Sequence, residues 1–247
     1  SKLNKNDDDY YEKMQKIIED HAIEASVAKI VGSVALADNA DDGVQIFGGA
    51  GFIEEYPAAQ IYRDERINRI FEGTNEINRL IIGGTIMKKA ILEEIPIRDM
   101  IQERAENWLP DISVQEQELI NECRAIEYCR SFILFCLHES ILKFGQDLKN
   151  KQWIIEPFAN MVIALSIMDT GYKRFLNIDD GEHKRNTLDV LKLSILDQVE
   201  QCNKMGMDIV VELFDTMLAQ EKINEINNWY SKTGYLPHRI DSQKKIV

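Results

Sequence analysis

Apolar residues recur every three or four positions through most of the 247-residue chain, which is the spacing of helices that bury one face. Alternation of apolar and polar residues, the pattern of a half-buried strand, is rare, and the chain has only five prolines. The pattern therefore predicts an all-α protein. The expected helices cover residues 9–47, with or without a break, 58–65, 74–91, 114–149, 154–176 and 184–219, and the chain from Tyr230 onward is expected to be extended.

Glycine and proline place the boundaries in the first third of the chain. Gly48 and Gly49 follow the first helix, where glycine lets the backbone leave helical dihedral angles, and Gly51 is expected to extend a flexible turn. Pro57 suits the first turn of the next helix, because its missing N–H is unpaired there in any case. These residues predict two helices joined by a glycine-rich turn.

A second boundary divides the chain as a whole. Thr74 or Asn75 is expected to cap the helix that runs to about residue 91, and Ile95–Pro96 ends that pattern. Beyond the proline the sequence consists of plain amphipathic helices, as expected for an up-down bundle with short turns. We therefore predict two domains, residues 1–94 and residues 95–247.

Composition excludes several classes of function. The net charge of −13 argues against a nucleic-acid-binding protein, which would carry a basic surface. The four cysteines form no CxxC pair, and three lie in one helical stretch, so we expect buried free thiols in a reducing compartment rather than disulfides or zinc ligands. The four histidines are scattered without metal-ligand spacing, so no metal site is expected, and no apolar run looks long enough to span a bilayer.

The segment of residues 44–89 has the highest density of residues that packing alone would not select. Glu72 lies there between Phe71 and Gly73, on a predicted connection. A carboxylate in an apolar cleft has a raised pKa and can act as a base near neutral pH, and the glycine leaves room for a substrate. Two alternatives remain from the local sequence: a solvated loop carboxylate, or an anion at the start of a helix.

The glycine-rich segment that begins at Gln45 also allows two interpretations. Its backbone amides can face a phosphate or a flavin-type cofactor, but it is not a GxGxxG motif after a strand, and a helix C-cap explains it equally well. The charged run from Arg63 to Arg66 can form a buried ion-pair cluster or a solvated face, of which the solvated face is the commoner case.

Taken together, four ordered blocks resemble the acyl-CoA dehydrogenase family over roughly residues 20–92. The Ile-Phe-Glu-Gly-Thr-Asn motif, the Gly83-Gly84-Thr85 continuation and the long helical extension resemble the very-long-chain type. The blocks are Gln45-Ile46-Phe47-Gly48-Gly49-Ala50-Gly51-Phe52, Glu55-Tyr56-Pro57, Tyr62-Arg63-Asp64-Glu65-Arg66-Ile67 and Ile70-Phe71-Glu72-Gly73-Thr74-Asn75-Glu76-Ile77.

The resemblance implies an FAD-dependent α,β-dehydrogenation of fatty acyl-CoA. Glu72 matches the family's catalytic base, its backbone amide would polarise the thioester carbonyl, and Gly73 matches a position against the acyl-CoA. The segment from Gln45 to Gly49 matches one that touches the FAD of a neighbouring subunit. The positions implied to contact FAD are Gln45, Ile46, Phe47, Gly48, Gly49, Thr74, Asn75 and Glu76.

The resemblance also implies an electron acceptor, an oligomer and further domains outside these 247 residues. It implies an electron-transfer flavoprotein as electron acceptor and a homodimer or homotetramer, in the bacterial cytoplasm or the mitochondrial matrix. The N-terminal helical domain and the β-domain of the family do not occur in these 247 residues, so we expect the C-terminal part of a longer enzyme, inactive alone. The alternative is a non-catalytic helical module for subunit association or membrane-surface docking. Mixed charges in the extension favour packing within the protein or between subunits over membrane contact.

Overall fold

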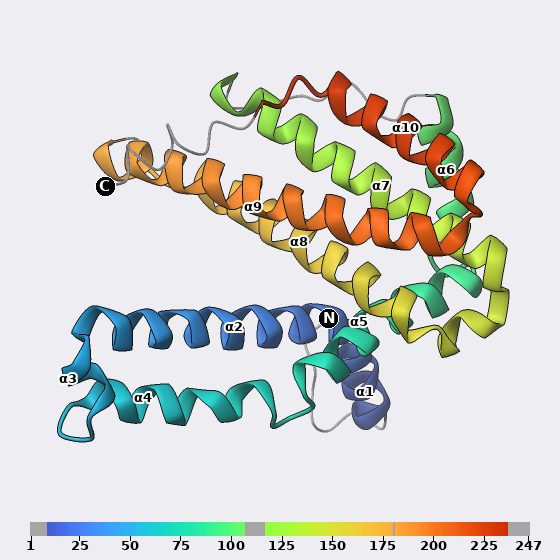
Figure 1. The fold of residues 1–247 in the computed structure, drawn as a ribbon. Helices are drawn as coiled ribbons and strands as arrows, with labels where there is room; N and C mark the ends of the chain where they lie inside the picture. The colour runs from blue at the N-terminus through green and yellow to red at the C-terminus, as the bar shows by residue number, and fades with distance from the viewer. Residues whose placement is uncertain (1–8, 107–116, 180, 237–247) are drawn as a thin grey trace. The chain divides into compact units, whose positions relative to one another are not determined.

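The computed structural model of the protein describes residues 9–106, 117–179 and 181–236, and over these residues it contains helices and no strand (Figure 1). The all-α prediction is confirmed. The chain divides into two compact units, residues 1–85 and residues 86–247. The predicted domain boundary after residue 94 was drawn from a change in sequence pattern rather than from compactness, and it stays a prediction.

The first unit is built around two helices that lie side by side, α2 and α4, joined at one end by the short helix α3 (Figure 1). The predicted first helix breaks at His21, which separates α1 from α2. The elements of this unit are α1 (Tyr10–Asp20), α2 (Ala22–Phe47), α3 (Gly49–Phe52), α4 (Pro57–Glu65), the 3-10 helix η1 (Arg66–Arg69) and the first part of α5 (Asn75–Ile91).

Small side chains let α2 approach its neighbours closely. Its buried residues follow a spacing of three and four, which places them on one face of the helix. That face packs against α4 and η1 and is lined by alanine and serine with a single isoleucine. The buried residues are Ser26, Ile30, Ser33, Ala37 and Ala40.

The glycine-rich turn is more ordered than the sequence predicted. Gly48 ends α2 with a positive φ of 59°, as expected for a C-cap glycine, and its N–H donates to the Gln45 carbonyl. The expectation that Gly51 extends a flexible turn is wrong, because Gly51 is buried inside α3. A β-carbon at Gly51 would lie 2.5 Å from the Val44 carbonyl oxygen, so only glycine fits against the end of α2.

We predict that Gly51→Ala destabilises the first unit by about 1–3 kcal/mol, the usual cost of overpacking. The new methyl group would also lie 2.8 Å from Cβ of Phe47, and neither obstacle is the free end of a flexible side chain. Urea denaturation of the variant measures the effect. Gly49→Ala is the matched control, because a β-carbon there meets no atom within 4 Å; equal stability of the two variants would contradict the steric explanation.

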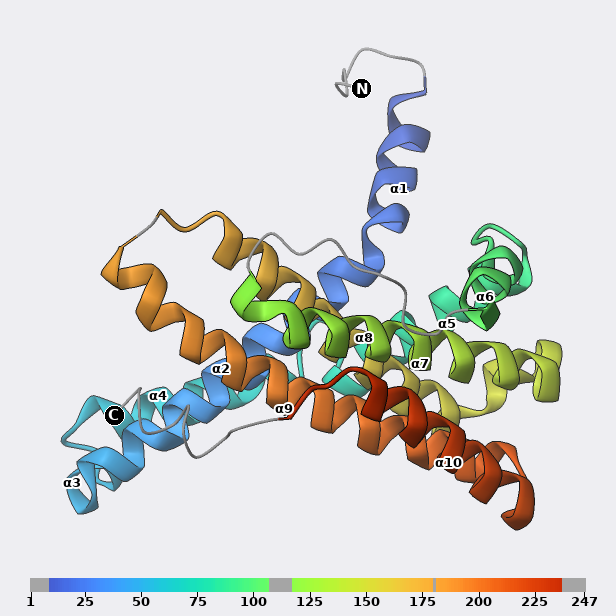
Figure 2. The same cartoon turned by 90° about the horizontal axis from the view of Figure 1, so that it is seen from above.

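The second unit is a bundle in which α7, α8 and α9 follow one another in alternating directions, with α10 against α7 and α9 (Figure 2). This confirms the prediction of a helical bundle after the first helical region. Its elements are the end of α5, α6 (Ile97–Glu106), the 3-10 helix η2 (Gln117–Leu119), α7 (Ile120–Phe144), the 3-10 helix η3 (Gly145–Asn150), α8 (Gln152–Leu176), α9 (Glu182–Leu213) and α10 (Thr216–Lys232).

Three boundaries of the second unit differ from the prediction. The helix expected over residues 184–219 is two helices, because Asp215 accepts hydrogen bonds from the N–H groups of Met217 and Leu218 and so begins α10. The prediction that the chain is extended from Tyr230 onward is wrong at its start, because Tyr230 lies within α10. Residues 237–247 of this predicted tail lie outside the described residues. Helix α6 was not predicted, and residues 114–116 of the predicted 114–149 helix also lie outside the described residues.

The bundle core contains the cysteines as free, buried thiols, as predicted. Cys129 and Cys136 on α7 and Cys202 on α9 are fully buried. Burial raises the pKa of the Cys129 and Cys136 thiols well above its ordinary value, because a thiolate would be desolvated there. Both thiols therefore stay protonated at neutral pH and act as small apolar side chains.

Helix α8 is the one described helix that is long and apolar enough to cross a membrane, which corrects the expectation that no such run exists. In the structure it is a core helix that packs against α7 and α9. Nearly half of its most apolar window is buried inside the protein. Its composition is therefore explained by the bundle core.

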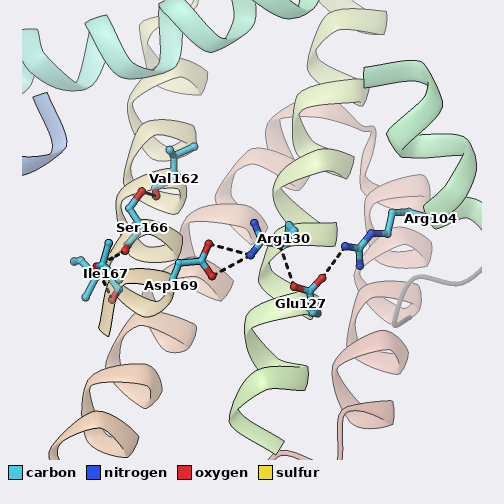
Figure 3. Close-up of polar contacts among 8 residues, drawn as sticks. Arg104, Glu127, Arg130, Val162, Ser166, Ile167 and Asp169 are labelled. Atoms are coloured by element: carbon cyan, nitrogen blue, oxygen red, sulfur yellow. Dashed lines mark hydrogen bonds and ion pairs between the residues drawn. The ribbon is translucent and has the colours of Figure 1, made fainter. Parts of the chain in front are cut away.

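A chain of ion pairs connects α6, α7 and α8 (Figure 3). Glu127 of α7 accepts from Arg104 of α6 at 2.7 Å and from Arg130 at 3.1 Å. Arg130 in turn donates to both carboxylate oxygens of Asp169 on α8, at 2.9 and 3.0 Å. Arg104 also donates to the Ser131 hydroxyl at 3.1 Å. These side chains attach α6 to the bundle, and Ile97 of the same helix is also buried.

We predict that Glu127 makes stability depend on pH in the acid range. Burial alone would raise the pKa of its carboxyl, but hydrogen bonds and charge from Arg104 and Arg130 outweigh this and lower it below 4.5. Its contribution is therefore present above the unfolded-state pKa and is lost as the pH falls through the lower folded-state pKa. Chemical denaturation between pH 7 and pH 3 should show the stability difference between wild type and Glu127→Gln shrinking below pH 4.5. A difference that does not change with pH would contradict the ion-pair explanation.

Candidate functional site

Glu72 lies on the short connection between η1 and α5, where its side chain is exposed. Its φ is 53°, and that of the following Gly73 is 81°, so two consecutive residues adopt left-handed backbone conformations. This region costs a non-glycine residue roughly 1–3 kcal/mol and persists only where the surroundings impose it. The neighbours of Glu72 therefore hold its backbone in a conformation that the residue would not choose alone.

Two donors from different helices bind the carbonyl oxygen of Gly73. The Lys29 ammonium of α2 donates to it at 2.9 Å, and the Asn78 side-chain amide of α5 donates at 2.8 Å. Asn78 also donates to the Thr74 carbonyl at 3.1 Å. The peptide between Gly73 and Thr74 is therefore held by donors from two helices.

Asn75, at the start of α5, is almost fully buried at 4% exposure. Its carbonyl oxygen accepts from Lys29 at 2.6 Å, and its amide nitrogen donates to the Ser33 hydroxyl at 2.9 Å. Ser33 is buried on α2 and donates in turn to the Ile30 carbonyl at 3.1 Å. The side chain of Asn75 thus connects α2 to the start of α5 inside the chain.

The start of α5 is capped as the sequence suggested, and the cap is Thr74. Its hydroxyl oxygen accepts from the N–H of Ile77 at 3.3 Å. Glu76 in the first turn is exposed, and its pKa is lowered by hydrogen bonds from its own backbone N–H and the Thr74 hydroxyl, with smaller contributions from the charges of Arg79 and Lys29. Glu76 therefore stays anionic at neutral pH.

The segment from Gln45 to Gly49 lies at the opposite end of α2 from the Glu72 turn (Figure 1). Lys29 marks the end of α2 that contacts Gly73, and 16 residues separate it from Gln45. At the helical rise of 1.5 Å per residue this is about 24 Å. All five residues are exposed, and a β-carbon at Gly48 or Gly49 meets no atom within 4 Å, so their backbone is open to approach. One copy of the chain does not bring the two groups of predicted site residues together.

The charged run from Arg63 to Arg66, at the end of α4, is mostly solvated, but one member is not. Glu65 is 3% exposed, and its carboxylate accepts from Arg69 at 2.9 Å, four residues further along the chain. Arg63 pairs with Glu54 at the surface. Both interpretations of this run thus hold in part, and the buried pair lies just before the Glu72 connection.

Comparison with known proteins identifies the first third of the chain. The family described as "Acyl-CoA dehydrogenase, C-terminal domain" matches residues 10–87, which include both groups of predicted site residues. Over residues 10–87 the chain is similar to the C-terminal domain of acyl-CoA dehydrogenases. A crystal structure of an acyl-CoA dehydrogenase complexed with FAD from Bacillus anthracis matches 93% of the chain with a TM-score of 0.83 and 28% identity.

Relatives of this family differ in how much of the chain they match. A probable acyl-CoA dehydrogenase of Bacillus subtilis is 38% identical over 64% of the chain, whereas the short-chain specific mitochondrial enzyme of Bos taurus is 45% identical over only 26%. The helices of the extension therefore occur in some acyl-CoA dehydrogenases and are not needed for the family match. The chain spans 27% of the length of the Bacillus subtilis relative and 39% of the Bacillus anthracis structure.

Sequence reasoning missed Lys29, Ser33 and Asn78 at this site. Lys29 precedes Gly73 by 44 residues, and its contact depends on the packing of α2 against the turn. In the sequence, Lys29 looks like any solvated helix lysine. Asn78 was assigned no role from the sequence. Asparagine side chains near a helix start often hydrogen-bond to the backbone of the preceding turn, and this tendency was the signal that could have identified it.

Proposed function

We propose that this chain supplies the catalytic base, Glu72, of an FAD-dependent acyl-CoA dehydrogenase. The observation that carries the proposal is the strained, exposed Glu72 turn, at φ 53°, inside the matched segment. Backbone conformations of this cost cluster at functional sites, and here the conformation falls at a carboxylate inside the matched segment. The activity belongs to the complete enzyme in which this segment acts, and these 247 residues alone are expected to be inactive.

In the proposed reaction, the Glu72 carboxylate removes a proton from the carbon next to the thioester carbonyl of an acyl-CoA. The backbone N–H of Glu72 polarises that carbonyl and so stabilises the developing negative charge. Gly73, which has no side chain, leaves the substrate access to the backbone. Bound FAD supplies the acceptor for the hydride that leaves the neighbouring carbon.

The exposed residues fit a flavin that is shared between two copies of the chain. Thr74 and Glu76 lie beside Glu72, whereas Gln45, Ile46, Phe47, Gly48 and Gly49 lie about 24 Å away along α2. A single copy cannot present both groups to one reaction centre, so we assign the second group to the FAD of a neighbouring subunit. Ile46 and Phe52 are 83% and 80% exposed at this end of the unit, as expected for a surface that another subunit covers.

The remaining assignments follow from the same proposal. The electron acceptor would be an electron-transfer flavoprotein, and the enzyme is a homodimer or homotetramer, in the bacterial cytoplasm or, if the source is eukaryotic, the mitochondrial matrix. The similarity of the extension to the Bacillus anthracis structure favours a role inside such an enzyme over an independent membrane-docking module. The type of acyl chain is left to experiment.

Flavin reduction tests the proposal directly. The complete enzyme should purify yellow, and anaerobic addition of a long-chain acyl-CoA should bleach the flavin absorbance and produce the trans-enoyl-CoA. Free coenzyme A is the control, because it lacks the acyl carbons that react. A colourless protein, or a flavin that stays oxidised with acyl-CoA of every chain length, would exclude the proposed activity and favour the non-catalytic helical module.

A further inference from the structure

We propose that Lys29 is a positioning residue for Glu72, and that it acts through the carbonyl of Gly73 without touching the substrate. The inference rests on the proposed role of Glu72 as the base, and it assigns Lys29 a part in the same reaction. Lys29 lies on α2, and its ammonium donates to the Gly73 carbonyl at 2.9 Å. The ammonium also donates to the Asn75 side chain, which in turn donates to Ser33. Asn78 of α5 donates to the same Gly73 carbonyl.

The first step is the strain in the turn. Glu72 and Gly73 have φ values of 53° and 81°, and only the second residue is a glycine. Without outside restraint, Glu72 would return to negative φ, and its carboxylate would point in a different direction. The Gly73 carbonyl lies one peptide beyond Glu72, so a restraint on that carbonyl limits how far the Glu72 backbone can rotate.

The second step is the direction of the restraint. Asn78 lies on the same helix that the turn enters, so its hydrogen bond to the Gly73 carbonyl moves together with the start of α5. Lys29 comes from a different helix, 44 residues earlier, and its hydrogen bond ties the Gly73 carbonyl to α2. The hydrogen bond to Lys29 is also charge-assisted, and such bonds are stronger than neutral ones.

The third step is that Lys29 is itself held in place. A lysine side chain normally samples many rotamers, which makes it a poor restraint. Here the ammonium also donates to the Asn75 carbonyl oxygen at 2.6 Å, and the other end of that amide is bound to Ser33 at 2.9 Å. Asn75 and Ser33 are 4% and 6% exposed, so this support is rigid. We therefore assign the Asn75 side chain to holding Lys29 rather than to contacting the flavin.

Such a role has a kinetic signature that differs from substrate binding. A displaced base lowers the rate of proton removal and leaves acyl-CoA binding largely intact, so kcat falls while KM changes little. A misplacement of about 1 Å can cost roughly 100-fold in rate. We expect Lys29→Met, which keeps the length of the side chain but loses the donor, to lower kcat about 10- to 100-fold and to change KM less than about threefold.

The test compares Lys29→Met with Lys29→Arg and with Lys16→Met, an exposed lysine of α1. In the complete enzyme, Lys29→Arg should recover most of the lost kcat, because it restores a charged donor, and Lys16→Met should behave as wild type. Hydrogen exchange on the 247-residue chain gives a readout that needs no activity. The amides of residues 72–76 should exchange at least about tenfold faster in Lys29→Met than in wild type, and residues 30–45 of α2 should be unchanged.

Unchanged exchange in residues 72–76, or a kcat within twofold of wild type, would overturn the positioning role. Faster exchange throughout both α2 and α5 would also overturn it, since Lys29 would then stabilise the unit as a whole. Failure of the proposed function looks different: Glu72→Gln would keep full turnover, while the exchange data would still report whether Lys29 fixes the turn. If Lys29→Met does not fold, Lys29→Gln, which keeps a neutral donor, takes its place in the same comparison.

Discussion

Replacing Glu72 by glutamine is expected to lower kcat about 10²- to 10⁴-fold, the range that a positioned general base contributes. Glutamine keeps the size and polarity of the side chain but cannot accept the proton from the acyl-CoA. Glu72 is exposed on its turn, and the contacts that hold the turn come from the backbone of Gly73 and from the side chain of Asn75. The substitution should therefore leave the fold and flavin binding intact, so that loss of turnover reports on the chemistry alone.

Steady-state kinetics with acyl-CoA and an artificial electron acceptor measures this effect, and flavin content is measured on the same samples. Glu24→Gln is the matched control, because it makes the same chemical change at an exposed position on α2. Glu72→Asp should lie between wild type and Glu72→Gln, since it keeps a carboxylate but withdraws it by one methylene. Wild-type turnover in Glu72→Gln would show that another group is the base.

The Glu72 turn also shows which parts of the site can be predicted from the sequence. Local chemistry left Glu72 with two ordinary explanations, and the ordered blocks around it pointed to a base. The cap at Thr74 and the C-cap at Gly48 were predictable because each depends on residues within four positions. The contact of Lys29 with Gly73 was not, because it joins residues that only the packing of the helices brings together.

The same distinction holds for the bundle. Apolar spacing predicted α8 closely, and the absence of a CxxC pair, with three cysteines in one helical stretch, predicted free, buried cysteines. It missed the break before α10, because Ile209, Leu213 and Met217 continue the helical period across Asp215, and a period cannot tell one long helix from two in sequence. It missed α6, although Ile97, Met100 and Ile101 have helical spacing there. The start of α10 is decided by a cap, which the apolar pattern does not show.

The tightest packing in the second unit yields the other large expected effect. Gly206 of α9 faces Phe132 of α7 and Met161 of α8, at a point where three helices meet. A β-carbon at Gly206 would lie 2.4 Å from two ring carbons of Phe132 and 2.9 Å from the terminal methyl of Met161. Both neighbours are fully buried, so neither can move aside into solvent. The glycine therefore sets the distance between the helices.

We expect Gly206→Ala to destabilise the second unit by about 1–3 kcal/mol, although alanine is the better helix former by about 1 kcal/mol. Thermal and urea denaturation measure the change. Gly32→Ala in α2 is the control, since a β-carbon there meets no atom within 4 Å, and it should be neutral or stabilising. Phe132→Leu provides a second test, because it removes the ring atoms that the new methyl group would meet. Combined with Gly206→Ala, it should cost less than the two single changes added together. Strict additivity would mean that the cost arises from something other than the contact between Gly206 and Phe132.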